Sequence, residues 1–486
     1  MLLQDLLKDL KYEVVNGSVS TEINKICYDN RKIEKNDIFV CIKGFATDGH
    51  KYALSAVQSG ASAVICEDDI DGIGNDITII KVEDTRKALA VMGAQYYGNP
   101  SKKLRMIGVT GTNGKTTSTM IIRDVLTKAG HKVGLIGTIA NYINDEKFKT
   151  ERTTPESLEL QELFAKMVDR GVEYCVMEVS SHALALDRVY GIDFDEAVFT
   201  NLTRDHLDMH KTFEAYYEAK FKLFRMAKNC IVNIDSEYGR RVVGDLKKEN
   251  LNKNIITFST KDEADYKAEK INLEAIESEF VVNNKKYSID IPGLYNVYNA
   301  LGCIAVCNLI NLPYEKIEAG LSEVSVPGRC QRVGKKHNID FSIIVDYAHT
   351  PDGLENILSS VKQVTKGRLI TVFGCGGNRD TVKRPQMGKI ASDLSDFVVV
   401  TSDNPRKEEP SKIIEDIMAG IDNKENCVTI ESRYDAIKKA ISIAEKDDSV
   451  VIAGKGHENY QILKDETIHF DDKEVVEEIL SSRDEV

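Results

Sequence analysis

Residues 106–130, MIGVTGTNGKTTSTMIIRDVLTKAG, place an apolar strand-like run, a glycine loop and a helical stretch directly after one another. Together these parts form a cradle for phosphate, because the loop N–H groups and the N-terminus of the helix face the anion. Lys115 can reach the terminal phosphates, and the hydroxyl of Thr116 can ligate Mg²⁺. The alternative is a glycine turn with a chance Gly-Lys-Thr, which the strand and helix on either side disfavour.

The same alternation of apolar runs and helical stretches continues on both sides of this loop. The runs after Leu104 are RMIGVT, KVGLIGT, EYCVMEV, EAVFTN and CIVNID, and those after Arg329 are FSIIVD, LITVFG, FVVVTS and SVVIAG. Such alternation predicts α/β units with mostly parallel sheets and helices on both faces. We therefore expect a small mixed α/β domain over residues 1–100, a central P-loop ATPase-like domain over 101–327 and a Rossmann-like domain over 328–486.

Length and composition are those of an ordinary globular protein. A chain of 486 residues is too long to fold around a single hydrophobic core, and its length suggests about three domains. The net charge of −13 argues against non-specific nucleic-acid binding, which needs a broad basic surface. No apolar run approaches the roughly 20 residues that span a bilayer. We expect a chain with no nucleic-acid or membrane partner, acting as a monomer.

The N-terminus and the cysteines favour a cytoplasmic location. MLLQDLLKDLKYE has acidic residues within its apolar stretch, which predicts an amphipathic helix and not a signal peptide. The ten cysteines are scattered without a Cys-x-x-Cys pair, and Cys303 and Cys307 lie in an apolar helical pattern. Reduced core cysteines are favoured over metal ligands or disulfides.

The loop sequence TGTNGKTT, residues 110–117, resembles the ATP loop of the Mur ligases, the amide-forming enzymes of peptidoglycan precursor synthesis. It departs from the usual Walker pattern, since Val109 stands where the first glycine belongs. The resemblance implies ATP and Mg²⁺ as cofactors. It implies ATP contacts from Gly111, Thr112, Asn113, Gly114, Lys115, Thr116 and Thr117.

Two further strand ends resemble catalytic motifs of that family. Glu178 begins EVSSH after one apolar run, and His206 lies in NLTRDHLD after the next. A carboxylate and an imidazole beside a triphosphate suit Mg²⁺ ligation or water positioning; singly, each could be a helix cap or a satisfied loop residue. Lys220, in YYEAKFKLF, would be a surface lysine by itself, but similar ligases carry a carbamylated lysine there that holds a second Mg²⁺. The predicted metal ligands are Thr116, Glu178, His206 and Lys220, and the predicted catalytic residues are Lys115, Glu178, His206 and Lys220.

Three later positions resemble nucleotide contacts of the same family. Asn299 lies in GLYNVYNA, which is similar to the segment that opens a helix near adenine or ribose. Arg329 and Asp346 match contacts to ATP from the third domain, and Arg332 is a possible substitute for Arg329. By itself the first segment is only a helix start that contains an asparagine.

The first block resembles the family's uridine-diphosphate pocket. Asn30 stands where the family usually has a serine, and a second segment, FATDGH, follows the run DIFVCIKG. The resemblance implies that the muramoyl dipeptide substrate is held by Asn30, Phe45, Ala46, Thr47, Thr153, Thr154, Ser180 and Arg188. Without the family these would be ordinary polar loop residues.

Polar residues also end three strands of the third block. Arg379 follows LITVF, the sequence Asp403-Asn404-Pro405-Arg406 follows FVVV, and Gly454 and Glu458 follow SVVI. Arginine side chains bind carboxylates, and acidic side chains bind ammonium groups. A pocket that contains both positive and negative side chains therefore favours an amino acid as its ligand. The alternative is a set of interstrand salt bridges. The predicted contacts are Arg379, Asp403, Asn404, Pro405, Arg406, Gly454 and Glu458.

Within the family, Asp-Asn-Pro-Arg looks like the signature of enzymes that add meso-2,6-diaminopimelate. Arg406 with Arg379 could grip the far carboxylate of that amino acid, which lysine lacks. The resemblance implies an ATP-dependent ligase that joins meso-2,6-diaminopimelate to the D-glutamate side chain of UDP-N-acetylmuramoyl-L-alanyl-D-glutamate through an acyl phosphate. Rival hypotheses are a lysine-adding ligase, a folylpolyglutamate synthetase, and, in another class, a module that senses ATP without ligase activity.

Overall fold

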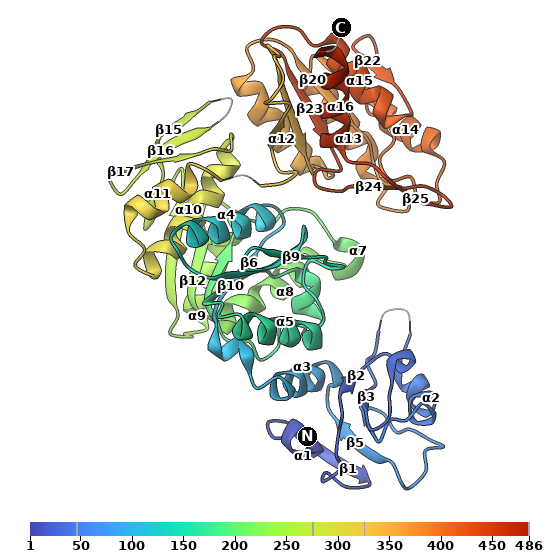
Figure 1. Cartoon of the computed structure of the whole chain (residues 1–486). Coiled ribbons are helices and arrows are strands. Elements are labelled where there is room, and N and C mark those ends of the chain that lie inside the picture. Colours follow the sequence, from blue (N-terminus) through green and yellow to red (C-terminus); the bar gives the residue numbers. More distant parts are fainter. Residues whose placement is uncertain (45–46, 275–276, 325, 485–486) are drawn as a thin grey trace. The chain divides into compact units, whose positions relative to one another are not determined.

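The computed structural model describes residues 1–44, 47–274, 277–324 and 326–484 (Figure 1). The chain divides into two compact units. The first comprises residues 1–119, 130–232 and 236–256, and the second comprises residues 120–129, 233–235 and 257–486. The three predicted domain boundaries stay a prediction. None of the helices in the described ranges combines the length and the apolar character that a bilayer crossing requires.

The first hundred residues form a five-stranded sheet of order β1-β5-β4-β3-β2, in which only β1 is antiparallel to its neighbour. Its strands are β1 (Tyr12–Asn16), β2 (Ile26–Cys27), β3 (Ile38–Val40), β4 (Ala63–Cys66) and β5 (Thr78–Val82). Its helices are α1 (Leu3–Leu6), α2 (Ala53–Gln58) and α3 (Thr85–Tyr96), with short 3₁₀ turns at η1 (Asn30–Lys32), η2 (Gly49–Tyr52) and η3 (Pro100–Lys103).

The predicted N-terminal helix is much shorter than its sequence pattern suggests. Helix α1 ends at Leu6, and the chain then forms strand β1. The sequence of β1, YEVVN, is rich in aromatic and β-branched residues that favour strands, and its pairing with β5 satisfies the main chain. Tertiary pairing therefore outweighs the local amphipathic pattern.

A nine-stranded sheet of order β14-β13-β12-β11-β6-β10-β7-β8-β9 contains the phosphate loop. Its strands are β6 (Arg105–Thr110), β7 (Val133–Ile136), β8 (Asn141–Ile143), β9 (Glu146–Phe148), β10 (Tyr174–Glu178), β11 (Phe194–Phe199), β12 (Ala227–Asn233), β13 (Asn254–Ser259) and β14 (Tyr266–Lys267). Its helices are α4 (Lys115–Lys128), α5 (Ser157–Asp169), α6 (Ser181–Ala185), α7 (Leu207–His210), α8 (Phe213–Met226) and α9 (Glu237–Lys248). Strand β6 lies between β10 and β11 and is parallel to both. The loops after these three strands therefore meet at one edge.

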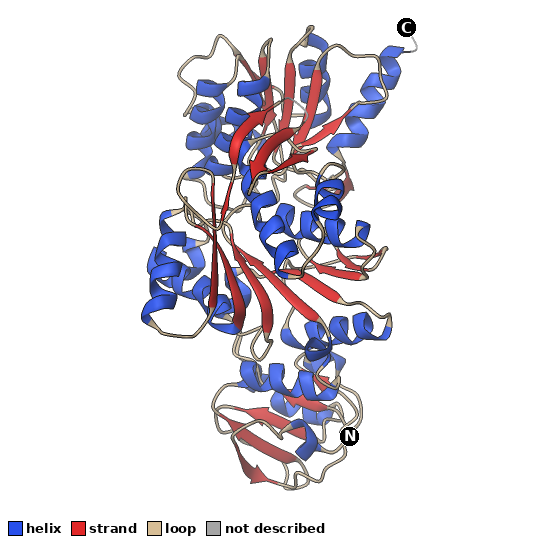
Figure 2. Cartoon of the chain, turned by 90° about the vertical axis from the view of Figure 1, so that its left-hand side faces the viewer, coloured by secondary structure: helices blue, strands red, loops and turns tan. Residues whose placement is uncertain are grey.

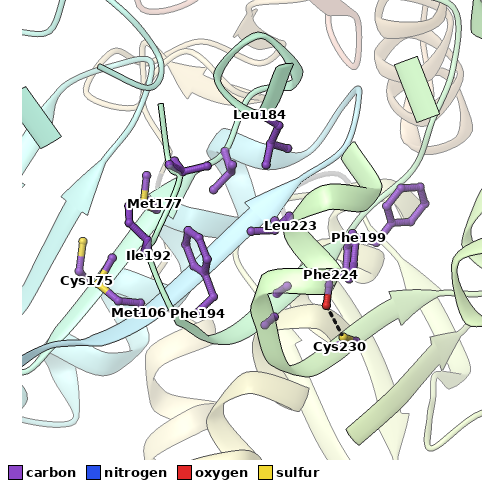
Figure 3. Close-up of a cluster of buried hydrophobic side chains, with 14 of the residues drawn as sticks. Met106, Cys175, Met177, Leu184, Ile192, Phe194, Phe199, Leu223, Phe224 and Cys230 are labelled. Atoms are coloured by element: carbon purple, nitrogen blue, oxygen red, sulfur yellow. Dashed lines mark hydrogen bonds between the residues drawn. The ribbon is translucent and has the colours of Figure 1, made fainter. Parts of the chain in front are cut away.

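Apolar side chains from β6, β10, β11 and α8 pack into one core cluster beneath that edge (Figure 3). Phe194, Phe199 and Phe224 are completely buried in it, and Sγ of Cys230 lies 3.6 Å from the carbonyl oxygen of Phe224. Each fully buried side chain of this size stabilises the fold by about 1.5–3 kcal/mol. The core thus fixes the strand ends from which the site is built.

The second unit contains a small antiparallel sheet and a larger parallel one. The small sheet consists of β15 (Glu269–Leu273), β16 (Ser278–Val282) and β17 (Lys285–Ile289), followed by α10 (Leu294–Leu309) and α11 (Tyr314–Leu321). The sequence patterns do not predict this small sheet.

The larger sheet has the order β18-β19-β23-β20-β21-β22 and is parallel except for β18. Its strands are β18 (Gln331–Val333), β19 (Ser342–Asp346), β20 (Leu369–Phe373), β21 (Phe397–Val400), β22 (Cys427–Thr429) and β23 (Ser449–Ala453), and β24 (Tyr460–Ile462) with β25 (Thr467–His469) forms a separate hairpin. Its helices are α12 (Pro351–Val364), α13 (Lys383–Leu394), α14 (Pro410–Met418), α15 (Arg433–Ile443) and α16 (Asp472–Asp484). Helices cover both faces of the parallel sheets (Figure 2), and the predicted α/β class is confirmed.

Candidate active site

The loop between β6 and α4 has the form that its sequence predicts. Gly111 has a φ of +152°, and a methyl group at its Cα would lie 1.9 Å from Oγ1 of Thr200, so only glycine fits. The N–H of Asn113 donates to Oδ1 of Asn201 at 3.0 Å, which braces the loop against the end of β11. Because α4 begins at Lys115, its N-terminus lies at the end of the loop, where an anion is stabilised.

Two lysines converge on this loop. Nζ of Lys115 donates to the carbonyl oxygens of Gly111 and Thr112, at 2.9 and 2.8 Å. Nζ of Lys220, from α8, donates to the same Gly111 oxygen and lies 4.7 Å from the ring centre of Tyr216. Burial, and then the charge of Lys115, lower the pKa of Lys220 well below its ordinary value. Lys220 is therefore a buried lysine whose charged form is disfavoured by its surroundings.

Glu178 lies at the end of β10, directly beside the loop. Its Oε2 accepts a hydrogen bond from Oγ1 of Thr116 at 2.9 Å and one from Oγ1 of Thr138 at 3.1 Å, and its Oε1 accepts from the N–H of Thr138 at 2.8 Å. Oγ1 of Thr153 lies 3.0 Å from Oγ1 of Thr138. Thr138 is not among the predicted site residues, although it shortly follows the β7 run and so belongs to the strand-end positions.

His206 lies in the loop after β11, on the other side of β6. It has a left-handed φ of +52°, and its side chain is 44% exposed, with Nε2 3.2 Å from Oδ2 of Asp205. Its ring meets the ring of His182 edge to face, with centres 4.8 Å apart. His182 belongs to α6, which begins shortly after Glu178. The structure thus brings both predicted metal-binding motifs to one edge of the sheet.

The donors at this edge fit a divalent cation. The hydroxyl of Thr116 and the carboxylate of Glu178 are already in contact, and they supply the oxygen ligands that Mg²⁺ prefers. A carbamate on Lys220 would add a further carboxylate next to Gly111. This arrangement can hold a nucleotide triphosphate and its metal.

Residues predicted to hold the muramoyl dipeptide form a connected group beside Glu178. Oγ1 of Thr154 donates to the carbonyl oxygen of Glu178 at 2.8 Å and accepts from the N–H of Ser180 at 3.1 Å. Nη1 of Arg188 donates to the carbonyl oxygen of Thr154 at 3.0 Å, and its Nη2 lies 2.9 Å from Oε1 of Glu156. Through Glu178, which also contacts Thr116, this group lies beside the phosphate loop.

The remaining predicted contacts of this substrate lie in the first hundred residues. Nδ2 of Asn30 donates to Oγ of Ser55 at 3.3 Å, and Oγ1 of Thr47 lies 3.0 Å from the hydroxyl of Tyr52. Both hydrogen bonds are exposed. Two of the predicted contacts, Phe45 and Ala46, lie outside the described residues.

The second unit supplies the other three predicted nucleotide contacts. Asn299 is buried in α10. Asp346 ends β19, where its Oδ2 accepts from the N–H of Cys330 at 2.6 Å, and burial raises the pKa of its carboxyl. The guanidinium of Arg329 lies 4.5 Å from the ring centre of Tyr347. The structure therefore brings Arg329 and Asp346 to the same strand end.

A small cavity of about 60 Å³ borders this group. Arg329 and its possible substitute Arg332 both line it, together with Lys335 and Asp290. Three cations and one carboxylate face the same space, so the cavity favours an anionic group.

The predicted amino-acid pocket is assembled by β20, β21 and β23, which are neighbours in the larger sheet. A methyl group at Gly454 would lie 2.7 Å from Oδ2 of Asp403. One at Gly376 would lie 2.9 Å from Nη1 of Arg406 and 3.9 Å from Cγ of Arg379. Asp403 therefore lies against the backbone of Gly454, and the two arginines lie against the backbone of Gly376, in neighbouring strand-end loops.

Asn404 and Glu458 are joined in this pocket. Nδ2 of Asn404 donates to Oε2 of Glu458 at 2.8 Å, and its Oδ1 accepts from the N–H of Ile462 at 2.9 Å. A methyl group at Gly377 would lie 1.9 Å from the carbonyl oxygen of Pro405, so these loops are in close contact. The nitrogen and the oxygen of the Asn404 amide therefore both form hydrogen bonds within the protein. Through the first of these bonds, Asn404 positions the carboxylate of Glu458.

Three fully buried cations beneath the pocket were not found by the sequence analysis. Each donates a hydrogen bond to a main-chain carbonyl oxygen in or next to a pocket loop. Arg384 donates to Gly376, Arg433 to Ala453 and Lys455 to Tyr460. Arg433 also forms two 2.7 Å hydrogen bonds to Asp472, and neither side chain is exposed. No local pattern distinguishes these residues from surface cations in the sequence.

Comparison with known proteins finds similarity to Mur ligases along most of the chain. Three family models match: "Mur ligase family, catalytic domain" over residues 22–97, "Mur ligase middle domain" over 109–307 and "Mur ligase, glutamate ligase domain" over 328–456. A protein of Clostridium perfringens called UDP-N-acetylmuramoyl-L-alanyl-D-glutamate--2,6-diaminopimelate ligase is 58% identical over 99% of this chain and 100% of its own length.

Solved structures give the same result. A structure called UDP-N-acetylmuramoyl-L-alanyl-D-glutamate--2,6-diaminopimelate ligase matches with a TM-score of 0.73 and 30% identity, covering 100% of this chain and 99% of that one. A MurF ligase from Thermotoga maritima in complex with ADP shares the fold, with a TM-score of 0.62 and 19% identity over 95% of this chain and 98% of its own.

Proposed function

The chain belongs to the Mur ligase family, and from this membership we propose its reaction in detail. It is an ATP-dependent ligase of peptidoglycan precursor synthesis that adds meso-2,6-diaminopimelate to UDP-N-acetylmuramoyl-L-alanyl-D-glutamate. The amide forms at the side-chain carboxylate of the D-glutamate. The observation that supports this choice of amino acid is that Arg379 and Arg406 both lie against Gly376, while Asp403 lies against Gly454 and Glu458 is bound by Asn404 in the neighbouring strand-end loops.

The pocket charges match the far end of diaminopimelate. That end carries a carboxylate and an ammonium, and two guanidinium groups with two carboxylates complement this pair. Lysine offers only an ammonium there, so it has no carboxylate for the two guanidinium groups to bind. The charge pattern thus favours diaminopimelate over the lysine-adding alternative.

The chemistry requires activation, because a carboxylate oxygen is a poor leaving group. The D-glutamate carboxylate oxygen attacks the γ-phosphorus of ATP, and the bond to ADP breaks. The neutral amine then attacks the carbonyl carbon of the acyl phosphate, inorganic phosphate leaves with the carbon–oxygen electron pair, and the nitrogen loses one proton. Lys115 stabilises charge on the phosphoryl group during transfer, since this reaction depends on positioning and electrostatics. The Thr154, Ser180 and Arg188 group orients the acceptor beside the loop.

Thr116, Glu178 and His206 would hold Mg²⁺, which when bound neutralises phosphate charge. Lys220 acts as a carbamate in this proposal: its neutral amine and CO₂ form an N–C bond and release one proton. Support for this comes from its burial and from the lowered pKa of its amine. The carbamate would supply a second anionic ligand for metal. The enzyme would work as a monomer in the cytoplasm.

The test is ADP release by the purified protein with ATP, Mg²⁺, the sugar-nucleotide dipeptide and diaminopimelate, followed by the omission of each component. We expect turnover only when all are present. ADP release that is indifferent to amino acid and sugar nucleotide would instead support an ATP-sensing module.

A further inference from the structure

Among the described strands, β24 and β25 form a two-stranded sheet of their own, separate from the six-stranded sheet. In β24, Tyr460 is exposed and Ile462 is partly exposed, whereas Gln461 between them is only 7% exposed. The alternation of a strand thus directs the Gln461 side chain into the protein. A buried glutamine amide needs hydrogen-bond partners there.

That partner is the loop that carries Arg406. Nε2 of Gln461 donates to the carbonyl oxygen of Asp403 at 2.7 Å in a buried hydrogen bond. The next residue, Ile462, donates its N–H to Oδ1 of Asn404 at 2.9 Å and accepts from the N–H of Arg406 at 3.0 Å. Three of the four residues 403–406 of the pocket loop are therefore held by two residues of the hairpin.

The loop needs such support because of its backbone. Arg406 has a left-handed φ of +55°, which is unfavourable for a residue with a Cβ. A conformation of this kind persists when the surroundings fix it. The hydrogen bonds from the hairpin anchor the loop at both of its ends, at Asp403 and at Arg406.

We infer that Gln461 is a positioning residue for amino-acid recognition, which holds residues 403–406 in the conformation that presents Arg406 and Asp403 to the far amino-acid head of diaminopimelate. This inference rests on the proposed function. Gln461 touches no substrate in this account and acts through the Asp403 carbonyl group. Its loss should therefore affect the amino acid and leave the nucleotide and sugar-nucleotide sites unchanged.

The experiment compares Gln461→Met and Gln461→Glu with wild type and with Lys464→Met, an exposed control on the same hairpin. Methionine keeps the bulk without a donor. Glutamate keeps the shape, but its ionised carboxylate cannot donate and repels the Asp403 carbonyl oxygen. We expect KM for meso-diaminopimelate to rise about tenfold or more in both variants, the scale of one lost buried hydrogen bond, with kcat and the KM values for ATP and sugar nucleotide changed by less than about twofold. Lys464→Met should match wild type.

An unchanged KM for diaminopimelate in both Gln461 variants would overturn the inference. So would an equal loss for all three substrates together with a lowered Tm, because Gln461 would then be a residue of general stability. If the wild-type protein showed no turnover that depends on diaminopimelate, the proposed function itself would be wrong. Failure of the proposed function can therefore be distinguished from failure of the inference about Gln461.

Discussion

Lys115 and Lys220 donate to one and the same acceptor, the carbonyl oxygen of Gly111, at 2.9 and 2.7 Å. One lysine comes from the phosphate loop and the other from α8, about a hundred residues later. Two ammonium groups on one oxygen repel each other, and burial adds to the cost of charge on Lys220. The site therefore holds an amine whose neutral form is favoured by its surroundings.

Lys220→Met should abolish ligase activity and stabilise the unliganded protein at neutral pH. Lys220 is charged in the unfolded chain at pH 7. When the chain folds, the amine must either lose its proton or bury its charge, and both cost free energy. Methionine has no charge and therefore avoids this cost. We expect a gain of about 0.5–2 kcal/mol in the free energy of unfolding, the usual scale of a single stabilising substitution. Chemical denaturation in CO₂-free buffer measures it.

The pH dependence of this gain has a definite sign. The folded-state pKa of Lys220 lies below the ordinary value of 10.5, so the unfolded state binds more protons and wild-type stability rises with pH up to about that value. The advantage of Lys220→Met should therefore shrink as pH is raised from 7 towards 10. An advantage that grows over this range would contradict the buried, depressed lysine.

Gly111→Ala should destabilise the protein and prevent ATP binding. A methyl group there would lie 1.9 Å from Oγ1 of Thr200. Overpacking of this kind lowers the free energy of unfolding by about 1–3 kcal/mol, because neighbouring groups must move to make room. Gly130→Ala is the matched control, because Gly130 also has a positive φ but has nothing within 4 Å of the added methyl. Equal losses in Tm for the two variants would show that the Thr200 contact is irrelevant.

Arg406→Ala should weaken diaminopimelate selection by about 2–5 kcal/mol, the scale for truncating one partner of a buried charge pair. Steady-state kinetics with varied diaminopimelate measure the change in kcat/KM. Lys407→Ala serves as a control, since Lys407 is the exposed next residue. If Arg406→Ala left KM and kcat for diaminopimelate at their wild-type values, the assignment of this pocket would be wrong.

Asp472→Asn should lower the free energy of unfolding by about 3–5 kcal/mol, because it leaves the buried guanidinium of Arg433 without its counter-charge. Asp393→Asn breaks an exposed ion pair with Lys389 and should cost less than about 0.5 kcal/mol. Urea denaturation of both variants makes the comparison. A small effect of Asp472→Asn would mean that Arg433 finds another partner.

The sequence predicts the parallel sheets and their strand ends well, because long apolar runs and helical stretches carry a strong local signal. Glu178 and Asp403 could be placed at ligand-facing edges for this reason. Short strands with no such signal, such as β15 and β24, could not be predicted. The same holds for the N-terminal helix, where pairing with β5 overrides the local pattern.

Contacts between distant segments account for what the sequence could not reveal at the site. Lys220 resembles a surface lysine until α8 is packed against the phosphate loop. Thr138, Gln461 and Arg433 act through hydrogen bonds to residues tens of positions away, and such bonds leave no spacing or composition signal. These residues follow only from the folded structure.

The most direct measurement is a competition experiment with wild-type protein. UDP-N-acetylmuramoyl-L-alanyl-D-glutamate, ATP and Mg²⁺ are supplied with equal concentrations of meso-diaminopimelate and L-lysine, and the products are identified by mass spectrometry. The account predicts the diaminopimelate-containing tripeptide as the dominant product, formed in step with ADP. A dominant lysine-containing product, or ADP without any amide product, would contradict it.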